Sequence, residues 1–235
     1  MPTSIILIFI FIFGLIIGSF LNCLIWRLRN KIPLTPVSVQ GACLPARQGS
    51  ASGRKGGDRW KRSYCPKCGK QIAWYDNIPL VSFISLKGKC RHCSQGISWQ
   101  YPAVELATGV LFVLAFYINF EFLIFNFNLI SNFKFQISNL IRDWFLISVM
   151  IVIFIYDLRW SEILDLVTLP ACLVVLVMNL ALGFSLWNLL ISGIIGSSFF
   201  LIQFLVSNGK WIGGGDIRLG LLMGLSLGWP VVLLA

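Results

Sequence analysis

The chain of 235 residues is 57% hydrophobic and only 12% charged, with a mean hydropathy of +0.82. Soluble domains are nearer half apolar and about a quarter charged. The composition therefore excludes an ordinary soluble domain and predicts an all-α polytopic membrane protein. The formal net charge of +10 would, taken alone, also fit a protein that binds nucleic acid.

The first apolar run, residues 1–26, carries no charged side chain and is long enough to cross about 30 Å of hydrocarbon. It lacks a basic region before the apolar run and a small-residue cleavage site, and its positive charges follow the run. We therefore predict a first transmembrane helix rather than a cleaved signal peptide.

Residues 27–100 form a basic segment between apolar runs. Fourteen of the 19 Lys and Arg residues lie between Arg27 and Arg91, with only two acids, Asp58 and Asp76. The positive-inside rule favours a cytoplasmic loop, an N-terminus outside, and contact with anionic lipid rather than nucleic acid. Residues 33–58 are rich in Pro, Gly and Ser and are predicted to be a mobile insertion.

This loop contains "CPKCGK" at 65–70 and "CRHCSQ" at 90–95, two Cys-x-x-Cys pairs separated by 21 residues. Four thiolates are the ligand number of a structural zinc site, and they leave no open position for a catalytic water. Disulfides are the alternative, but a cytoplasmic loop is a reducing environment that favours zinc. The predicted zinc ligands are Cys65, Cys68, Cys90 and Cys93.

Five more apolar runs predict the remaining spans, at 101–118, 142–158, 163–184, 187–207 and 217–235. The intervening segment 119–140 alternates apolar residues with Asn, Ser and Lys. We expect it to be an external loop or an interfacial helix. The sequence stops inside an apolar run, so we expect a truncated form of a longer protein.

Two aspartates lie at the edges of predicted spans. Asp157 ends the span 142–158, and Asp216 follows Gly213, Gly214 and Gly215. Alternating crossings put both on the side of the basic loop, at similar depth. Two carboxylates held close together cannot both ionise easily, so one keeps a proton while the other activates a water, as in aspartic proteases. Glycines without β-carbons would let a peptide substrate approach Asp216 closely.

Structural interpretations of these aspartates stay open. Asp216 could be the N-cap of the following helix, and Asp157 could pair with Arg159 or mark the membrane interface. Asp165 precedes "LVTLP" and is interpreted as a cap of the next helix rather than a catalytic group.

Several motifs together resemble those of the bacterial prepilin peptidases (type IV prepilin leader peptidase/N-methyltransferases), membrane aspartic proteases of the GxGD type. "GSFLNCLIWRL" (18–28) resembles the first-helix signature of that family. Residues 65–105 resemble its zinc-binding domain, "DLRWSEILDLVTLP" (157–170) its first catalytic segment, and "GGGDIRL" (213–219) its second.

The resemblance implies that Asp157 and Asp216 are catalytic, with Gly213, Gly214 and Gly215 forming the active-site loop. It implies cleavage of the basic leader of type IV prepilins or pseudopilins after a glycine, at the cytoplasmic face of the bacterial inner membrane. Methylation of the new N-terminus with S-adenosylmethionine is implied as a second activity, with no residues assigned to it. The corresponding division is a first helix (1–26), a zinc loop (27–100) and a membrane peptidase domain (101–235).

Because both the loop and the leader are basic, we expect the leader to be recognised by lipid or by acids such as Asp58, Asp76 and Glu105. Rival interpretations are a non-catalytic zinc-loop scaffold of a pilus or secretion assembly system, a transporter with paired intramembrane acids, and a presenilin-like protease. The cysteine pairs favour the prepilin interpretation over the last.

Overall fold

The computed structural model describes residues 3–30, 65, 67–125 and 131–234. Within these residues the chain is helical and forms no β-strand, only an isolated antiparallel bridge between Lys89 and Gly96. The elements are α1 (Thr3–Arg29), η1 (Trp74–Asn77), α2 (Val81–Ser85), α3 (Gln100–Phe125), α4 (Ser131–Trp160), α5 (Asp165–Ala181), α6 (Leu186–Ser207), α7 (Gly214–Leu227) and η2 (Val231–Leu234).

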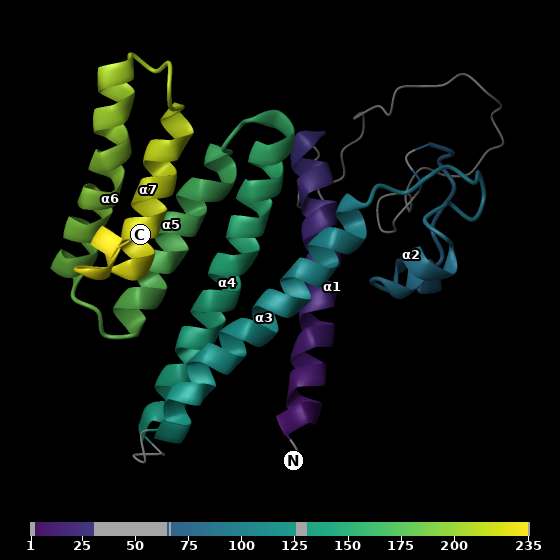
Figure 1. Cartoon of the computed structure of the whole chain (residues 1–235), viewed down its shortest axis with the longest axis horizontal. Coiled ribbons are helices and arrows are strands. Elements are labelled where there is room, and N and C mark those ends of the chain that lie inside the picture. Colours follow the sequence, from purple (N-terminus) through teal and green to yellow (C-terminus); the bar gives the residue numbers. More distant parts are fainter. Residues whose placement is uncertain (1–2, 31–64, 66, 126–130, 235) are drawn as a thin grey trace, which may run out of the picture.

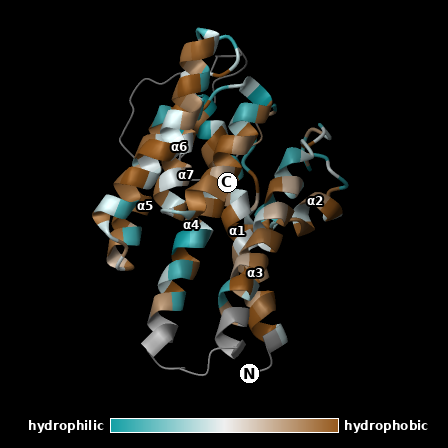
Figure 2. Ribbon diagram, turned by 60° about the vertical axis from the view of Figure 1, so that its left-hand side comes forward, coloured by the Kyte–Doolittle hydropathy of each residue, from teal (hydrophilic) through white to brown (hydrophobic). Residues whose placement is uncertain are grey.

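Four of these helices, α1, α3, α4 and α6, are long and apolar enough to cross a membrane. In Figure 1, α3 crosses α1 and lies beside α4, whereas α6 is separated from these three helices by α5 and α7. Figure 2 shows hydrophobic residues along all four helices. The other two predicted spans are also helices, but α5 has 17 residues and α7 has 14. The prediction of an all-α polytopic membrane protein is confirmed.

Two predicted segments differ in the structure. The interpretation of 119–140 as a loop is wrong for its described residues, because α3 continues to Phe125 and α4 begins at Ser131. The alternative, a helix in the membrane interface, stays a prediction. The polar side chains of this segment do not all require water: the Asn119 amide donates to the carbonyl of Ala115 (2.8 Å) and to the carboxylate of Asp143 on α4 (3.0 Å). The predicted insertion 33–58 lies outside the described residues.

The last predicted span, 217–235, ends early. Helix α7 stops at Leu227, and Gly228 then adopts a left-handed φ of 71°. Pro230 follows, and a proline has no backbone N–H with which to continue the helical hydrogen bonds. The apolar composition of 228–234 therefore does not extend the helix.

Close helix crossings are built at glycines. A β-carbon on Gly18 of α1 would lie 2.7 Å from the Cα of Glu105 on α3, and one on Gly224 of α7 would lie 2.2 Å from the carbonyl oxygen of Ser192 on α6. Both distances are shorter than a van der Waals contact, so only glycine lets these helix pairs approach so closely.

Helix α4 joins two hydrophobic clusters. Val152 and Tyr156 of α4 pack with α1 and α3, whereas Val149 and Ile153 pack with α5, α6 and α7. The second cluster, called here the peptidase-half core, contains Val149, Ile153, Ala171, Cys172, Val175, Leu189, Leu222 and Leu225. Because α4 contributes to both, it fixes the α1–α3 pair against the last three helices.

Candidate active site and metal-binding loop

Asp157 lies in the last turn of α4, at the end where the chain turns into α5. It follows Ile153 by four residues and Val149 by eight, and residues at these spacings share one face of a helix. Both of those side chains belong to the peptidase-half core. Asp157 therefore continues the core-facing stripe of α4 beyond the core, where its side chain is exposed.

Asp216 lies in the first turn of α7, and its carboxylate accepts the backbone N–H of Gly213 (3.0 Å). This bond satisfies one of the free amides at the start of the helix. Asp216 precedes Leu219 by three residues, and Leu219 packs against the peptidase-half core. Asp216 is half-buried. The prediction that Asp216 is the N-cap is wrong, because Gly213 is the N-cap and Asp216 binds its amide from the first turn of the helix. Asp216 also lies one turn beyond the same core as Asp157.

The turn between α4 and α5 connects the end of α4, which carries Asp157, to the start of α7, which carries Asp216. Ile163 in this turn packs against the peptidase-half core, and a β-carbon on Gly215 would lie 2.6 Å from the Cβ of Ile163. An ion pair between Asp165, at the start of α5, and Arg218 of α7 ties the same segments. The first turn of α7 thus packs on the segment that begins four residues after Asp157. Within the described chain no hydrogen bond or ion pair joins the two aspartates directly.

The three glycines before Asp216 have different surroundings in the structure. Gly215 is pressed against Ile163, so a side chain there would collide. A β-carbon on Gly214 would meet nothing within 4 Å. Among these three glycines, packing within the described chain therefore requires glycine only at Gly215, while the space beside Gly214 is open.

The α4–α5 turn also contacts the end of α1 that leads into the basic loop. Arg29 lies 3.7 Å from the carboxylate of Glu162 and stacks over the ring of Trp160, 5.0 Å from its centroid. Arg159 donates to the hydroxyl of Ser98, just before α3 (3.4 Å). The aspartate end of α4 and the basic loop therefore lie at the same end of the helical bundle (Figure 1).

The four cysteines of the two Cys-x-x-Cys pairs converge. All four sulfur atoms lie within 4.8 Å of one another, and those of Cys65 and Cys93 are 3.9 Å apart. Tetrahedral zinc with Zn–S bonds of about 2.3 Å separates its sulfur ligands by about 3.8 Å. The donor set and spacing fit a metal ion bound by Cys65, Cys68, Cys90 and Cys93, and the predicted grouping is confirmed.

The backbone builds the two halves of this cluster in the same way. The Gly69 amide donates to the Cys65 carbonyl, and the Ser94 amide donates to the Cys90 carbonyl, each at 2.9 Å. Gly69 and Ser94 both have a positive φ, of 66° and 55°. Each pair is therefore folded into a tight turn that directs two sulfur atoms to one point.

The thiols of the second turn have unequal proton affinities. Backbone amides of His92 and Cys93 point at the Cys90 sulfur and lower the pKa of that thiol to about 7. The Gln95 amide lowers the pKa of Cys93, but burial and the neighbouring sulfurs outweigh it and raise that pKa to about 11. A metal ion must displace protons from such thiols to bind.

An ion pair supports the second turn from outside. Arg91, between the two cysteines, donates through two nitrogens to Asp76 of η1, at 2.8 and 2.6 Å, and lies over the ring of Tyr75. The hydrogen bond from Arg91 lowers the pKa of Asp76. Bidentate pairing of this kind fixes geometry as well as charge, so η1 and the cysteine turn are held together.

Two acids that were expected to face a basic leader are engaged elsewhere. Asp76 is neutralised by Arg91. Glu105 is buried, only 7% exposed, and its carboxylate accepts the backbone N–H of Leu80 (2.9 Å). Asp58 lies outside the described residues. No local pattern predicts these pairings or that of Arg218 with Asp165, because the partners are 15 to 53 residues apart.

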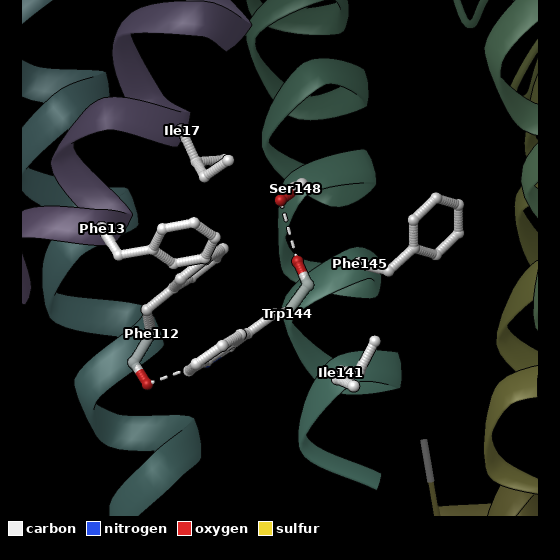
Figure 3. A pocket seen from close by; sticks show the side chains of 7 residues that line it. All are labelled: Phe13, Ile17, Phe112, Ile141, Trp144, Phe145 and Ser148. Carbon is white, nitrogen blue, oxygen red and sulfur yellow. Dashed lines mark hydrogen bonds between the residues drawn. The ribbon is translucent and has the colours of Figure 1, made fainter. Parts of the chain in front are cut away.

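An apolar hollow of ≈ 200 Å³ lies between α1, α3 and α4 (Figure 3). Trp144 stacks on Phe112, with ring centroids 5.1 Å apart, and donates its indole N–H to the Phe112 carbonyl. Ser148, which also lines the hollow, precedes Asp157 by nine residues, which places the two half a turn apart around α4. The hollow therefore opens on the face of α4 opposite to Asp157 and is separate from the aspartate end.

Comparison with known proteins agrees with these features. The chain matches the Bacterial Peptidase A24 N-terminal domain over residues 12–119 and the Type IV leader peptidase family over residues 144–235. A prepilin leader peptidase/N-methyltransferase of Klebsiella pneumoniae is 33% identical over 231 residues, covering 95% of this chain and 86% of the relative. One from Burkholderia pseudomallei is 30% identical, covering 99% of this chain and 72% of the relative.

Other relatives match over shorter segments at higher identity. A Vibrio cholerae prepilin leader peptidase/N-methyltransferase is 42% identical over 110 residues, which is 47% of this chain and 36% of the relative. No solved structure gives a significant match.

Fold and site together define a class: a polytopic α-helical membrane protein with a cluster of four cysteines that could hold a metal ion and two aspartates at one end of the bundle. The near full-length match to relatives makes the assignment specific. The chain belongs to the type IV leader peptidase family and is a membrane peptidase.

Proposed function

We propose that this protein cleaves the leader peptide from type IV prepilins or pseudopilins, with Asp157 and Asp216 as the catalytic pair. The observation that carries the proposal is that both aspartates extend one hydrophobic core by a single turn, at the end of the bundle where Ile163 meets Gly215. The printed names of relatives that span nearly the whole chain, prepilin leader peptidases, supply the substrate class.

In the proposed reaction one carboxylate takes a proton from a water that attacks the scissile carbonyl. The other carboxyl, protonated, gives its proton to the carbonyl oxygen as the water attacks. When the C–N bond breaks, the leaving amine takes the proton that the first carboxyl gained from water, and the second carboxylate recovers a proton from a hydroxyl of the tetrahedral intermediate. The exposed side chain of Asp157 is free to turn toward a bound peptide. One oxygen of Asp216 holds the Gly213 amide, which orients its carboxyl and leaves the other oxygen for the reaction. The open space beside Gly214 suits an extended peptide backbone.

The proposed topology places the basic loop and both aspartates at the cytoplasmic face of the bacterial inner membrane, with the N-terminus outside. The positive-inside rule supports this orientation, because most cations of the chain lie in the loop. A prepilin with its apolar segment in the membrane and its basic leader in the cytoplasm would then present its scissile bond, after a glycine, at the depth of the aspartates.

We also propose a structural zinc ion on Cys65, Cys68, Cys90 and Cys93. It would supply no reaction chemistry, since four thiolates complete its coordination. N-methylation of the new N-terminus is a second candidate activity, favoured by the word N-methyltransferase in the names of the relatives. S-adenosylmethionine would be the methyl donor. In this proposal the chain has three parts: a first transmembrane helix (1–26), a zinc-binding loop (27–100) and a membrane peptidase domain (101–235).

The proposal is tested with the membrane-embedded protein and a prepilin carrying a basic leader, a glycine and a following phenylalanine. Mass spectrometry should detect release of the leader after the glycine, and a gain of one methyl group when S-adenosylmethionine is added. A variant with both Asp157→Asn and Asp216→Asn should release no leader. Release by that double variant at the parental rate would reject the aspartate mechanism and favour the scaffold interpretation.

The glycines before Asp216 give a matched pair of variants. Gly215→Ala is expected to lower leader cleavage roughly 10–100-fold, because the new methyl group collides with Ile163 and displaces the first turn of α7. Gly214→Ala meets open space and should alter stability by no more than about 0.5 kcal/mol. Initial cleavage rates and thermal unfolding of both variants check this. Equal loss of thermal stability in the two variants would contradict the packing of Ile163 against Gly215 alone.

A further inference from the structure

The metal-binding loop exposes large apolar side chains close to one another in sequence. In η1 and α2 these are Trp74 (80% exposed), Val81 (58%) and Ile84 (74%), with Tyr75 and Ile78 between them. Exposed apolar side chains grouped in this way are typical of a surface that binds a protein or a membrane rather than one that faces water. The group Trp74, Tyr75, Ile78, Val81 and Ile84 is called here the loop's apolar edge.

The apolar edge lies at the depth of the membrane helices. Leu80, the residue before α2, donates its backbone N–H to Glu105 (2.9 Å), whose side chain also bonds to Ser19 of α1. Glu105 is five residues inside the span that begins at Gln100, or about 7 Å along the helix at 1.5 Å per residue. Figures 1 and 2 both show α2 at the height of α1 and α3, not beyond the end of the bundle.

Helix α2 is two-sided despite its short length. Phe83 turns toward the rest of the loop, where its ring lies 4.9 Å from that of Trp99 and against Gly88. Val81 and Ile84, three residues apart and so neighbours on a helical face, are exposed instead. Helix α2 thus carries an exposed apolar face in addition to the side chain that packs on the loop.

Charge around the apolar edge is positive. Lys67, Lys70, Lys87 and Lys89 are all exposed, and the one acid among residues 67–99, Asp76, is neutralised by Arg91. Interfacial segments combine an apolar face that enters the membrane by about 5–10 Å with flanking cations that attract anionic headgroups. Aromatic side chains such as those of Trp74 and Tyr75 prefer this same zone.

We propose that the apolar edge is inserted in the anionic lipid leaflet on the side of the basic loop, so that the metal-binding loop lies on the membrane surface and is held there by lipid as well as by Glu105. The leaflet is the partner because the Leu80–Glu105 bond fixes the edge beside a membrane span. The inference does not depend on the peptidase mechanism.

The test uses the full-length protein in nanodiscs, with a benzoylphenylalanine photocrosslinker replacing Ile84 or Trp74. In nanodiscs containing phosphatidylglycerol, irradiation should yield lipid adducts by mass at both positions. Ile16, an exposed residue inside the span α1, provides the reference for full lipid contact. Lys67→Gln and Lys87→Gln should each weaken insertion about fivefold, since one cation at an anionic surface is worth about 1 kcal/mol, while leaving the yield at position 16 unchanged.

Crosslinks only to protein, from a second copy or another chain, would overturn the proposal, and so would the absence of lipid adducts at 74 and 84 when position 16 gives them. Equal yields of lipid adducts in nanodiscs of phosphatidylcholine alone would overturn the proposed preference of the apolar edge for anionic lipid. Metal content is measured on every variant, so that a loop that has lost its fold is recognised. Leader cleavage measured on the same samples separates this result from the proposed activity.

Discussion

Asp157→Asn and Asp216→Asn, made singly, are each expected to lower leader cleavage by about 10³-fold or more. An amide cannot take a proton from water or hold the proton that the scissile carbonyl needs, and acid–base catalysis by one group contributes about 10²–10⁴-fold. Initial rates with a saturating prepilin concentration measure the effect on the chemical step. Because the two groups act as a unit, the double variant should be no slower than the slower single variant.

A structural role of Asp216 can be separated from a catalytic one. The side-chain oxygen of an asparagine can still accept the Gly213 amide that Asp216 accepts at 3.0 Å, so Asp216→Asn should keep the start of α7. Asp216→Ala removes the cap and should cost about 1 kcal/mol of stability. Catalysis lost in both variants, with unfolding temperature lowered only in the alanine variant, supports the proposed role. Activity retained by asparagine and lost only with alanine would make Asp216 a cap.

The parts of the fold that follow from local pattern are predictable from the sequence. The long apolar runs before Trp26 and after Leu186 appear as α1 and α6. The cysteine cluster is predictable because Cys-x-x-Cys needs only a tight turn, and its two turns have matching hydrogen bonds in the structure. Even the grouping of the two aspartates at one end follows from counting crossings.

What the sequence could not predict depends on partners distant in the chain. The polar composition of segment 119–140 favours a loop, but in the structure Asn119 of α3 donates a hydrogen bond to Asp143 of α4. The three successive glycines are equivalent in the sequence, but in the structure only Gly215 packs closely against Ile163. Glu105 resembles a free acid available to a leader, yet the Leu80 amide occupies it. In each case a tertiary contact, absent from any local pattern, decides the role of the residue.

Cys65→Ser is expected to remove the bound metal ion. Structural zinc binds with about 10–16 kcal/mol, so one of four thiolates carries roughly 3 kcal/mol, or about a hundredfold in Kd. Cys65 is the most buried of the four, at 7% exposed, and a serine hydroxyl there is a poor ligand. Metal per chain, measured by plasma mass spectrometry after dialysis against a weak chelator, should fall from one zinc to a small fraction.

Loss of the metal should open the loop without dismantling the helices. The backbone hydrogen bonds of residues 67–99 mostly join residues no more than five positions apart. Loss of the metal ion should therefore let the two cysteine turns separate, and the amide hydrogens of these turns should exchange faster in Cys65→Ser, whereas those of α4 and α7 should not. Cys23→Ser is the matched control, because Cys23 is a free thiol of α1 outside the cluster. Full metal content in Cys65→Ser, or equal loss in Cys23→Ser, would contradict the four-cysteine site. Since Asp157 and Asp216 lie on helices packed around a separate core, the metal-free variant should keep measurable leader cleavage.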